Sequence, residues 1–266
     1  MSNRFNLASA FALAVCFFAN SASAQIVLFD DFDASTNPTG LPTVNGGTSD
    51  IGGAIWNADA TIGVDGTINT PLGNINNDGA FLPFTFVAGN SYLLEASITN
   101  NNSPWVALGF VENTAPTAND RRFTNSTTNG ARGIATILTR NSGNHQETFG
   151  GVSTGNGGGE FGGPLGEDLY DETLPLDLSI LLDSTLGTAT YTINGDTANQ
   201  VVLTGIPTAN IAGIGLTYED NNTSGTASVD FIRLTDVTSA PVPEPSSLAL
   251  LGLGAIGLVT RRRRRA

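Results

Sequence analysis

The chain has almost no cysteine, histidine or lysine. Its 266 residues include one cysteine, Cys16, one histidine, His145, and no lysine. A single cysteine excludes an internal disulfide, and one cysteine with one histidine supplies too few ligands for an ordinary zinc site. The body of the chain also lacks the 3.6-residue apolar period of amphipathic helices. Its stability must therefore come from packing of another kind of element, helped at most by a bound cation.

Positive charge is scarce as well. The precursor carries a net charge of −13, and without Arg4, Glu244 and the five C-terminal arginines the remainder has 5 arginines against 23 acids, about −18. Binding to nucleic acid or to anionic lipid depends on Lys and Arg neutralising phosphates. We therefore expect no nucleic-acid partner. An acidic surface favours solubility outside the cell and the binding of divalent cations.

Residues 1–24 have the layout of a secretory signal peptide. Arg4 supplies the positive start, residues 7–19 are apolar, and Ala22 and Ala24 form a small-x-small cleavage site. This pattern predicts export by the Sec machinery and cleavage by signal peptidase before Gln25. A lipoprotein would need cysteine where Gln25 stands. Because Cys16 is removed with the signal, the mature protein should contain no thiol.

The C-terminal residues 241–266 combine a short polar motif, an apolar run and a basic end. The apolar residues 248–259 and their uncharged neighbours span 15 positions, or about 22 Å as a helix, which is less than the roughly 30 Å of a bilayer core. We expect a short hydrophobic helix that anchors the chain only transiently in the inner membrane. The five basic residues would keep this end on the cytoplasmic side; they are Arg261, Arg262, Arg263, Arg264 and Arg265.

This tail resembles the PEP-CTERM sorting signal of Gram-negative bacteria. The matching parts are Pro243-Glu244-Pro245, the apolar run and the arginine cluster, in that order at the C-terminus. The resemblance implies recognition by an exosortase, a membrane protease that cuts near the motif, and delivery to the cell envelope or the extracellular matrix. The alternative is an ordinary C-terminal membrane anchor.

Residues 25–240 have the pattern of one all-β domain. Short runs that favour strands, several of them alternating at period two, are separated by turns rich in Gly, Asn, Thr and Ser. This spacing predicts an antiparallel β-sandwich or jelly roll, with a hairpin that joins the sixth and seventh runs and a glycine-rich loop over 150–166. The expected strands are 26–32, 81–86, 91–99, 105–112, 134–139, 176–183, 188–193, 201–203, 211–218 and 227–235.

Three segments of this body resemble the concanavalin A-like lectin/glucanase jelly roll, including its laminin-G-like members. They are residues 28–33 as a first strand, the hairpin around 181–195, and residues 227–234 as a last strand that returns beside the first. The alternative is another β-sandwich, of the carbohydrate-binding-module type. The resemblance implies either a glycan-binding or structural domain or a polysaccharide hydrolase.

Catalysis is disfavoured by the arrangement of the acids. The glucanases of this fold carry Glu-x-Asp-x-x-Glu on one strand, and no such spacing occurs in this chain. Glu95 is alone on its strand, and His145 lies in a polar turn without the Gly-x-Ser-x-Gly pattern of serine hydrolases. We therefore predict a protein that is not an enzyme, with a glycoside hydrolase of the same fold as the alternative.

Two groups of residues are candidates for ligand binding. Calcium takes six to eight oxygen ligands, and carboxylates from the first and last strands could approach one ion if those strands pair; the residues are Asp30, Asp31, Asp33 and Asp230. The alternative is that these acids are ordinary strand-end residues. Aromatic rings that could stack on sugars are Trp56, Trp105 and Tyr170, although the apolar neighbours of the two tryptophans favour a place in the core. An extracellular polysaccharide would then be the partner.

Overall fold

The structure is a computed structural model, in which the body of the chain forms a compact unit over Gln25–Val237. It describes residues 24–33, 43–59, 62–69, 78–101, 105–115, 133–142, 145–146, 149–152, 160–164, 170, 174–219 and 226–238. No helix within these ranges is long and apolar enough to span a membrane. The predicted signal peptide and the predicted C-terminal helix lie outside the described residues.

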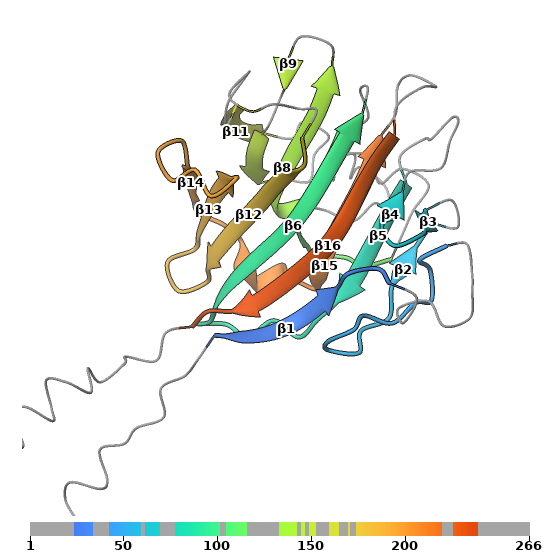
Figure 1. The fold of residues 1–266 in the computed structure, drawn as a ribbon. Helices are drawn as coiled ribbons and strands as arrows, with labels where there is room; N and C mark the ends of the chain where they lie inside the picture. The colour runs from blue at the N-terminus through green and yellow to red at the C-terminus, as the bar shows by residue number, and fades with distance from the viewer. Residues whose placement is uncertain are drawn as a thin grey trace, which may run out of the picture. The chain divides into compact units, whose positions relative to one another are not determined.

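Two antiparallel sheets face each other across one apolar core (Figure 1). The described strands of sheet 1 follow the order β14 (Val201–Thr204), β13 (Thr188–Ile193), β12 (Leu176–Asp183), β6 (Ser91–Asn101), β16 (Thr226–Asp236), β4 (Ile68–Asn69) and β3 (Gly63–Val64), and β1 (Gln25–Asp30) also pairs with β16. Those of sheet 2 follow the order β11 (Glu160–Pro164), β10 (Phe149–Val152), β8 (Gly133–Ser142), β7 (Trp105–Val111), β15 (Gly213–Glu219), β5 (Asp78–Pro83) and β2 (Asn57–Ala58), with β9 (His145–Gln146) on β8.

Alternation along the strands of sheet 1 separates a core face from an outer face. In β12 the residues Leu178, Ile180 and Leu182 are buried, whereas Ser179 and Leu181 between them are partly or fully exposed. The same period of two occurs in β13. A strand with this pattern can pack only one face against a core, so the second sheet covers the buried side.

The ten strands predicted from the sequence are all present; β12 and β13 have the predicted ends, and the ends of the other eight are shifted. The hairpin of β12 and β13 and the pairing of the first strand with the last are confirmed. The predicted strand 81–86 is wrong at its end, because β5 stops at Pro83 and the rings of Phe84 and Phe86 pack on Tyr92 at centroid distances of 5.6 and 5.4 Å.

The glycine-rich segment 150–166 is not only a loop. It contains the end of β10 and all of β11, and β10 pairs with β8. Glycine gives no alternating pattern to read, so the backbone pairing of β10 with β8 and of β11 with β10, rather than the sequence, reveals these strands. Four further strands, of two residues each, were not predicted: β2, β3, β4 and β9.

Gly109 in β7 lies too close to the backbone of β8 to carry a side chain. A Cβ atom at this position would lie 2.3 Å from the Ala135 carbonyl oxygen and 2.7 Å from Thr136 Cα, which are backbone atoms of β8. Replacement of Gly109 by alanine should therefore lower the free energy of unfolding by about 1–3 kcal/mol or more. Urea unfolding followed by tryptophan fluorescence measures this loss. Ser228→Ala, on the outer face of β16, is the control and should change stability by less than about 0.5 kcal/mol.

Candidate functional site

The chain turns sharply where β1 ends, around the buried residue Phe32. Phe32 has a φ of 58° and no solvent exposure, a left-handed conformation that costs a bulky residue roughly 1–3 kcal/mol. The carboxylate of Asp30 holds this conformation from inside the core. Its Oδ1 accepts a hydrogen bond from the Phe32 N–H at 2.8 Å, and its Oδ2 accepts one from Trp56 Nε1 at 2.7 Å. The rings of Phe32 and Trp56 lie 5.8 Å apart.

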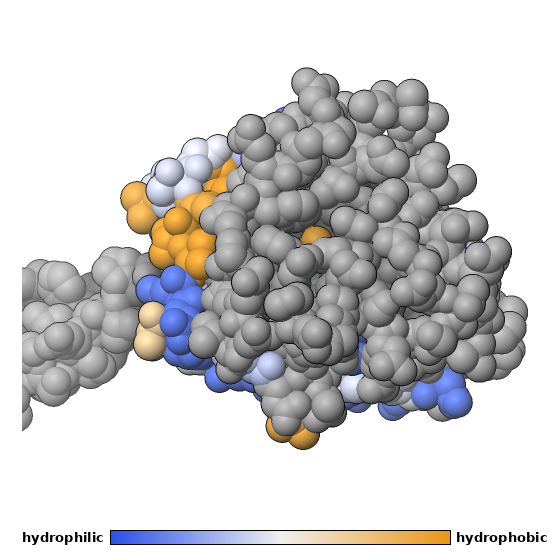
Figure 2. Space-filling model, turned by 90° about the horizontal axis from the view of Figure 1, so that it is seen from above, coloured by the Kyte–Doolittle hydropathy of each residue, from blue (hydrophilic) through white to orange (hydrophobic). Residues whose placement is uncertain are grey.

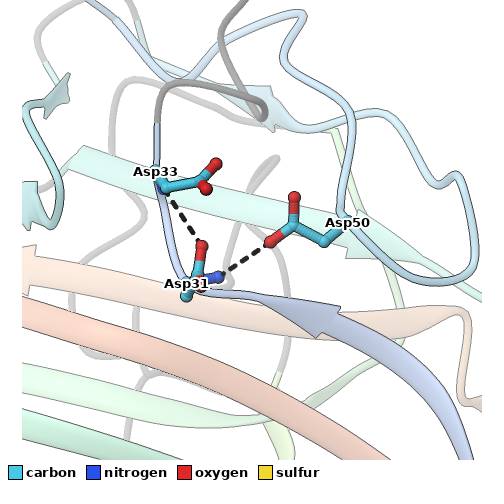
Figure 3. Close-up of side chains that lie close together, drawn as sticks. All are labelled: Asp31, Asp33 and Asp50. Carbon is cyan, nitrogen blue, oxygen red and sulfur yellow. Dashed lines mark hydrogen bonds between the residues drawn. The ribbon is translucent and has the colours of Figure 1, made fainter.

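This turn places two exposed carboxylates, Asp31 and Asp33, beside a third, Asp50 (Figure 3). One oxygen from each lies within 4.8 Å of the other two. The Asp31 N–H donates to Asp50 Oδ2 at 3.2 Å, and the Asp33 N–H donates to Asp31 Oδ1 at 3.2 Å. We name Asp31, Asp33 and Asp50 the carboxylate cluster.

The segment that carries Asp50 is fixed against β1 by its neighbours. Ile51 exchanges two backbone hydrogen bonds with Phe29, at 3.1 and 3.3 Å. Gly52 then adopts a φ of 91°, and a Cβ there would lie 2.4 Å from the Val27 carbonyl oxygen. Only glycine allows the chain to pass so close to β1, and this close passage brings Asp50 to the turn.

Three carboxylates so close together suit a hard cation. Calcium and similar ions take carboxylate oxygens at 2.3–2.6 Å and accept irregular geometry, and a positive ion would relieve the mutual repulsion of the three charges. The donor set contains oxygen alone, which fits calcium and not a thiophilic metal. Backbone carbonyls and water would complete the coordination sphere.

The structure divides the four predicted metal ligands. Asp31 and Asp33 belong to the carboxylate cluster, together with Asp50, which the sequence analysis missed. Asp30 points into the core, where two donors bind its carboxylate. Asp230 lies at a bulge of β16, between Val229 and Phe231, and is not part of the cluster.

The three predicted aromatic ligands differ in their surroundings. Trp56 is 1% exposed and bonds Asp30, so it offers no free face to a sugar. Trp105 begins β7, and its side chain is outside the described part of the chain. Tyr170 is half-buried, and its hydroxyl donates to Asp196 at 3.3 Å. Burial, followed by the charge of Asp196, raises the pKa of Tyr170 above its ordinary value.

Of the other residues considered for catalysis, Glu95 has a clear partner, and the side chain of His145 is not described. Both oxygens of Glu95 accept hydrogen bonds from Arg233, at 2.8 and 2.9 Å. This ion pair raises the pKa of Arg233. His145 belongs to the short strand β9, and its side chain is not among those described.

Comparison with known families identifies the tail. The PEP-CTERM protein-sorting motif matches residues 241–265. The chain carries a PEP-CTERM sorting signal. This signal implies processing by an exosortase and places the protein among exported, cell-surface proteins. The match covers only the tail, so it says nothing about what the body of this PEP-CTERM protein binds.

Solved structures show the fold of the body. The carbohydrate recognition domain of Emp47p matches with a TM-score of 0.53 and 11% identity, over 82% of this chain and 99% of that domain. The carbohydrate recognition domain of Emp46p, in a metal-free form, matches with a TM-score of 0.50 and 8% identity, over 67% and 87%. The body therefore has the concanavalin A-like lectin fold. An alginate lyase from Pseudomonas aeruginosa matches at a lower TM-score of 0.43, with 13% identity, over 69% and 82%. No curated protein matches the sequence.

Proposed function

We propose that this is an exported surface protein, trimmed by an exosortase, whose β-sandwich binds glycans without cleaving them. The observation that carries the proposal is the joining of a PEP-CTERM signal to a body with the fold of carbohydrate recognition domains. Surface delivery supplies the location at which glycans are met, and the fold supplies a scaffold used for their recognition elsewhere. A purely structural role in the extracellular matrix is the outcome if no glycan binds.

The route to the surface follows from the two ends of the precursor. The Sec machinery and signal peptidase would remove residues 1–24, and residues 241–266 would then hold the domain 25–240 at the inner membrane until the exosortase cuts. Within the domain, Gln25 pairs with Asp236. Both ends of the domain therefore emerge side by side, away from the carboxylate cluster at the other end of β1.

Glycan binding can be tested with a glycan array, probed with the mature protein in calcium and again in EDTA. The proposal predicts selective binding to some surface or matrix polysaccharide. A uniformly blank array in both buffers, from protein shown to be folded, would contradict glycan recognition and leave the structural role.

We further propose that the carboxylate cluster binds calcium. With three carboxylates the site supplies enough charge, and the strained turn at Phe32 fixes two of them before the ion arrives. Calcium bound there would join the segment after β1 to the segment that carries Asp50. An ion that binds only the folded state at 100 times its Kd would add about 2.7 kcal/mol of stability.

Asp50→Asn should weaken calcium binding at least tenfold, because it removes one of the three negative charges. Isothermal titration calorimetry with calcium chloride measures the affinity, and the melting temperature in calcium against EDTA gives an independent reading. Asp65→Asn, at an exposed turn outside the cluster, should bind like the unaltered protein. Equal calcium affinity of Asp50→Asn and Asp65→Asn would show that the carboxylate cluster is not the calcium site.

The second candidate function is polysaccharide hydrolysis, and one observation favours it. The close carboxylates of the cluster approach the spacing of about 5–5.5 Å between the two acids of retaining glycosidases. A general acid of such an enzyme, however, lies in an apolar pocket, whereas all three carboxylates are exposed. Turnover of a β-glucan panel that Asp31→Asn abolishes would establish the hydrolase.

A further inference from the structure

A continuous row of side chains crosses the outer face of sheet 1. In register, Thr192 of β13 lies beside Ser179 of β12, which lies beside Glu95 of β6. Glu95 lies beside Arg233 of β16, and Arg233 beside Phe29 of β1. All five are partly exposed, while their sequence neighbours on the same strands face the core. We name these five residues, of which four are polar and one is Phe29, the polar row. Four strand spacings make it about 19 Å long.

The polar row contains two pairs of hydrogen-bonded side chains, Ser179 with Thr192 and Glu95 with Arg233. Ser179 and Thr192 share a bond between their hydroxyls. Arg233 uses Nε and Nη2 to bind Glu95, and its guanidinium lies 5.7 Å from the centroid of the Phe231 ring. Within the described part of the chain, no group bonds Arg233 Nη1. The side chains of Arg233 and Glu95 are 39% and 24% exposed. A ligand on this face can therefore accept from Nη1 and donate to Glu95.

An apolar row runs parallel to the polar row, two residues away along β13, β12, β6 and β16 and three residues away along β1, where the register shifts. In register its order is Val202, Thr190, Leu181, Leu93, Thr235 and Ile26. Val202, Leu181 and Ile26 are 50%, 39% and 38% exposed. In Figure 2, hydrophobic side chains gather at one edge of the molecule, on the side where β13 and β14 lie in Figure 1, and the described side chains along the lower rim are mostly hydrophilic. The two rows are roughly 7 Å apart.

We infer that these two rows form a binding surface for a neutral polysaccharide, laid across the strands on the outer face of sheet 1. The inference rests on the proposed function, glycan binding, and names its surface and its ligand class. A sugar ring presents apolar C–H groups on its faces and hydroxyls at its edge. The C–H faces of the sugar can pack on the apolar row, and its hydroxyls can form hydrogen bonds with the polar row. A surface about 19 Å long fits an extended chain better than a single sugar.

Charge selects a neutral ligand. Glu95 already neutralises Arg233, so the row offers no free cation to a uronate or a sulfate. The mature protein has a net charge near −18, which repels acidic polymers. The far end of the row also approaches the carboxylate cluster, since Phe29 pairs with Ile51, the neighbour of Asp50. The inference does not depend on an ion at that cluster.

Affinity electrophoresis of the mature protein tests the surface, with gels that contain soluble β-glucan, xylan or dextran, and alginate as the acidic comparison. Retardation by at least one neutral polymer and none by alginate is expected. Arg233→Met removes the N–H donors but keeps a side chain on Phe231, and it should weaken the neutral binding at least tenfold. Ser179→Ala should weaken it by a smaller factor.

The control variant is Leu186→Ser, which replaces an apolar residue 72% exposed in the β12–β13 turn. It should bind as well as the unaltered protein. If Arg233→Met binds neutral polysaccharides as well as the unaltered protein does, the two rows are not the binding surface, although glycan recognition itself is not contradicted. Glycan binding absent from the unaltered protein would overturn both. A dimer that Arg233→Met dissociates would assign the face to a second copy of the chain and also overturn the inference.

Discussion

Replacement of Pro243, Glu244 and Pro245 by alanine should leave the protein uncut in a host that has the exosortase. The family match lies on this segment, and the protease is expected to recognise the motif rather than the apolar run behind it. The full-length chain, lacking only its signal peptide, should then accumulate in the inner membrane. Immunoblots of membrane and medium fractions measure this shift, which should approach complete loss of the released form.

Two controls separate recognition from anchoring. Ser246→Ala with Ser247→Ala, directly behind the motif, should be processed normally. Deletion of residues 261–265 removes the basic stop and should let the chain pass through the membrane uncut. Normal release of the alanine-substituted motif would show that the tail works as an ordinary anchor and is shed by some other route.

Asp30→Ala should destabilise the fold more than any other single loss of a carboxylate in the described residues. Asp30 is completely buried and accepts from Trp56 Nε1 and the Phe32 N–H. Each donor left buried without an acceptor costs about 1–3 kcal/mol, so the loss in free energy of unfolding should reach about 2–6 kcal/mol. The left-handed turn at Phe32 would also lose the group that holds it.

Urea unfolding followed by fluorescence measures this loss, and a double-mutant cycle assigns it. In a Trp56→Phe background the indole donor is absent, so Asp30→Ala should cost about 1–3 kcal/mol less. In EDTA, which removes any calcium from the carboxylate cluster, Asp31→Ala, one residue later and exposed, should change stability little. Similar losses for Asp30→Ala and Asp31→Ala would show that the buried hydrogen bonds do not hold the turn.

Most strands that the sequence predicted carry an apolar signal that can be read directly. In sheet 1, β12 and β13 alternate buried and exposed residues at period two, whereas in sheet 2 the described residues of β5, β7 and β15 are mostly buried at successive positions. The strands that were missed are short or rich in glycine, such as β10 and β11. Their place depends on backbone pairing with neighbours far away in the sequence, and no side-chain pattern records that pairing.

The candidate site was harder to predict for the same reason. The acids after β1 could be recognised in the sequence, and buried and exposed positions alternate from Leu28 to Asp33. A carboxylate is so rarely fully buried, however, that the sequence offered no reason to place Asp30 inward. Asp50 is 17 residues beyond Asp33 and carries no local signal of its own. The one hint was the Gly52-Gly53 pair, which marks a tight passage of the chain.

The intact mass of the protein recovered from the surface or medium of an exosortase-bearing host tests the central claim most directly. The account predicts a chain that begins at Gln25, ends near Pro243–Pro245 and lacks all five C-terminal arginines. A mass that still includes residues 248–266 would contradict it, because the protein would then have reached the surface or the medium without cleavage of its sorting signal.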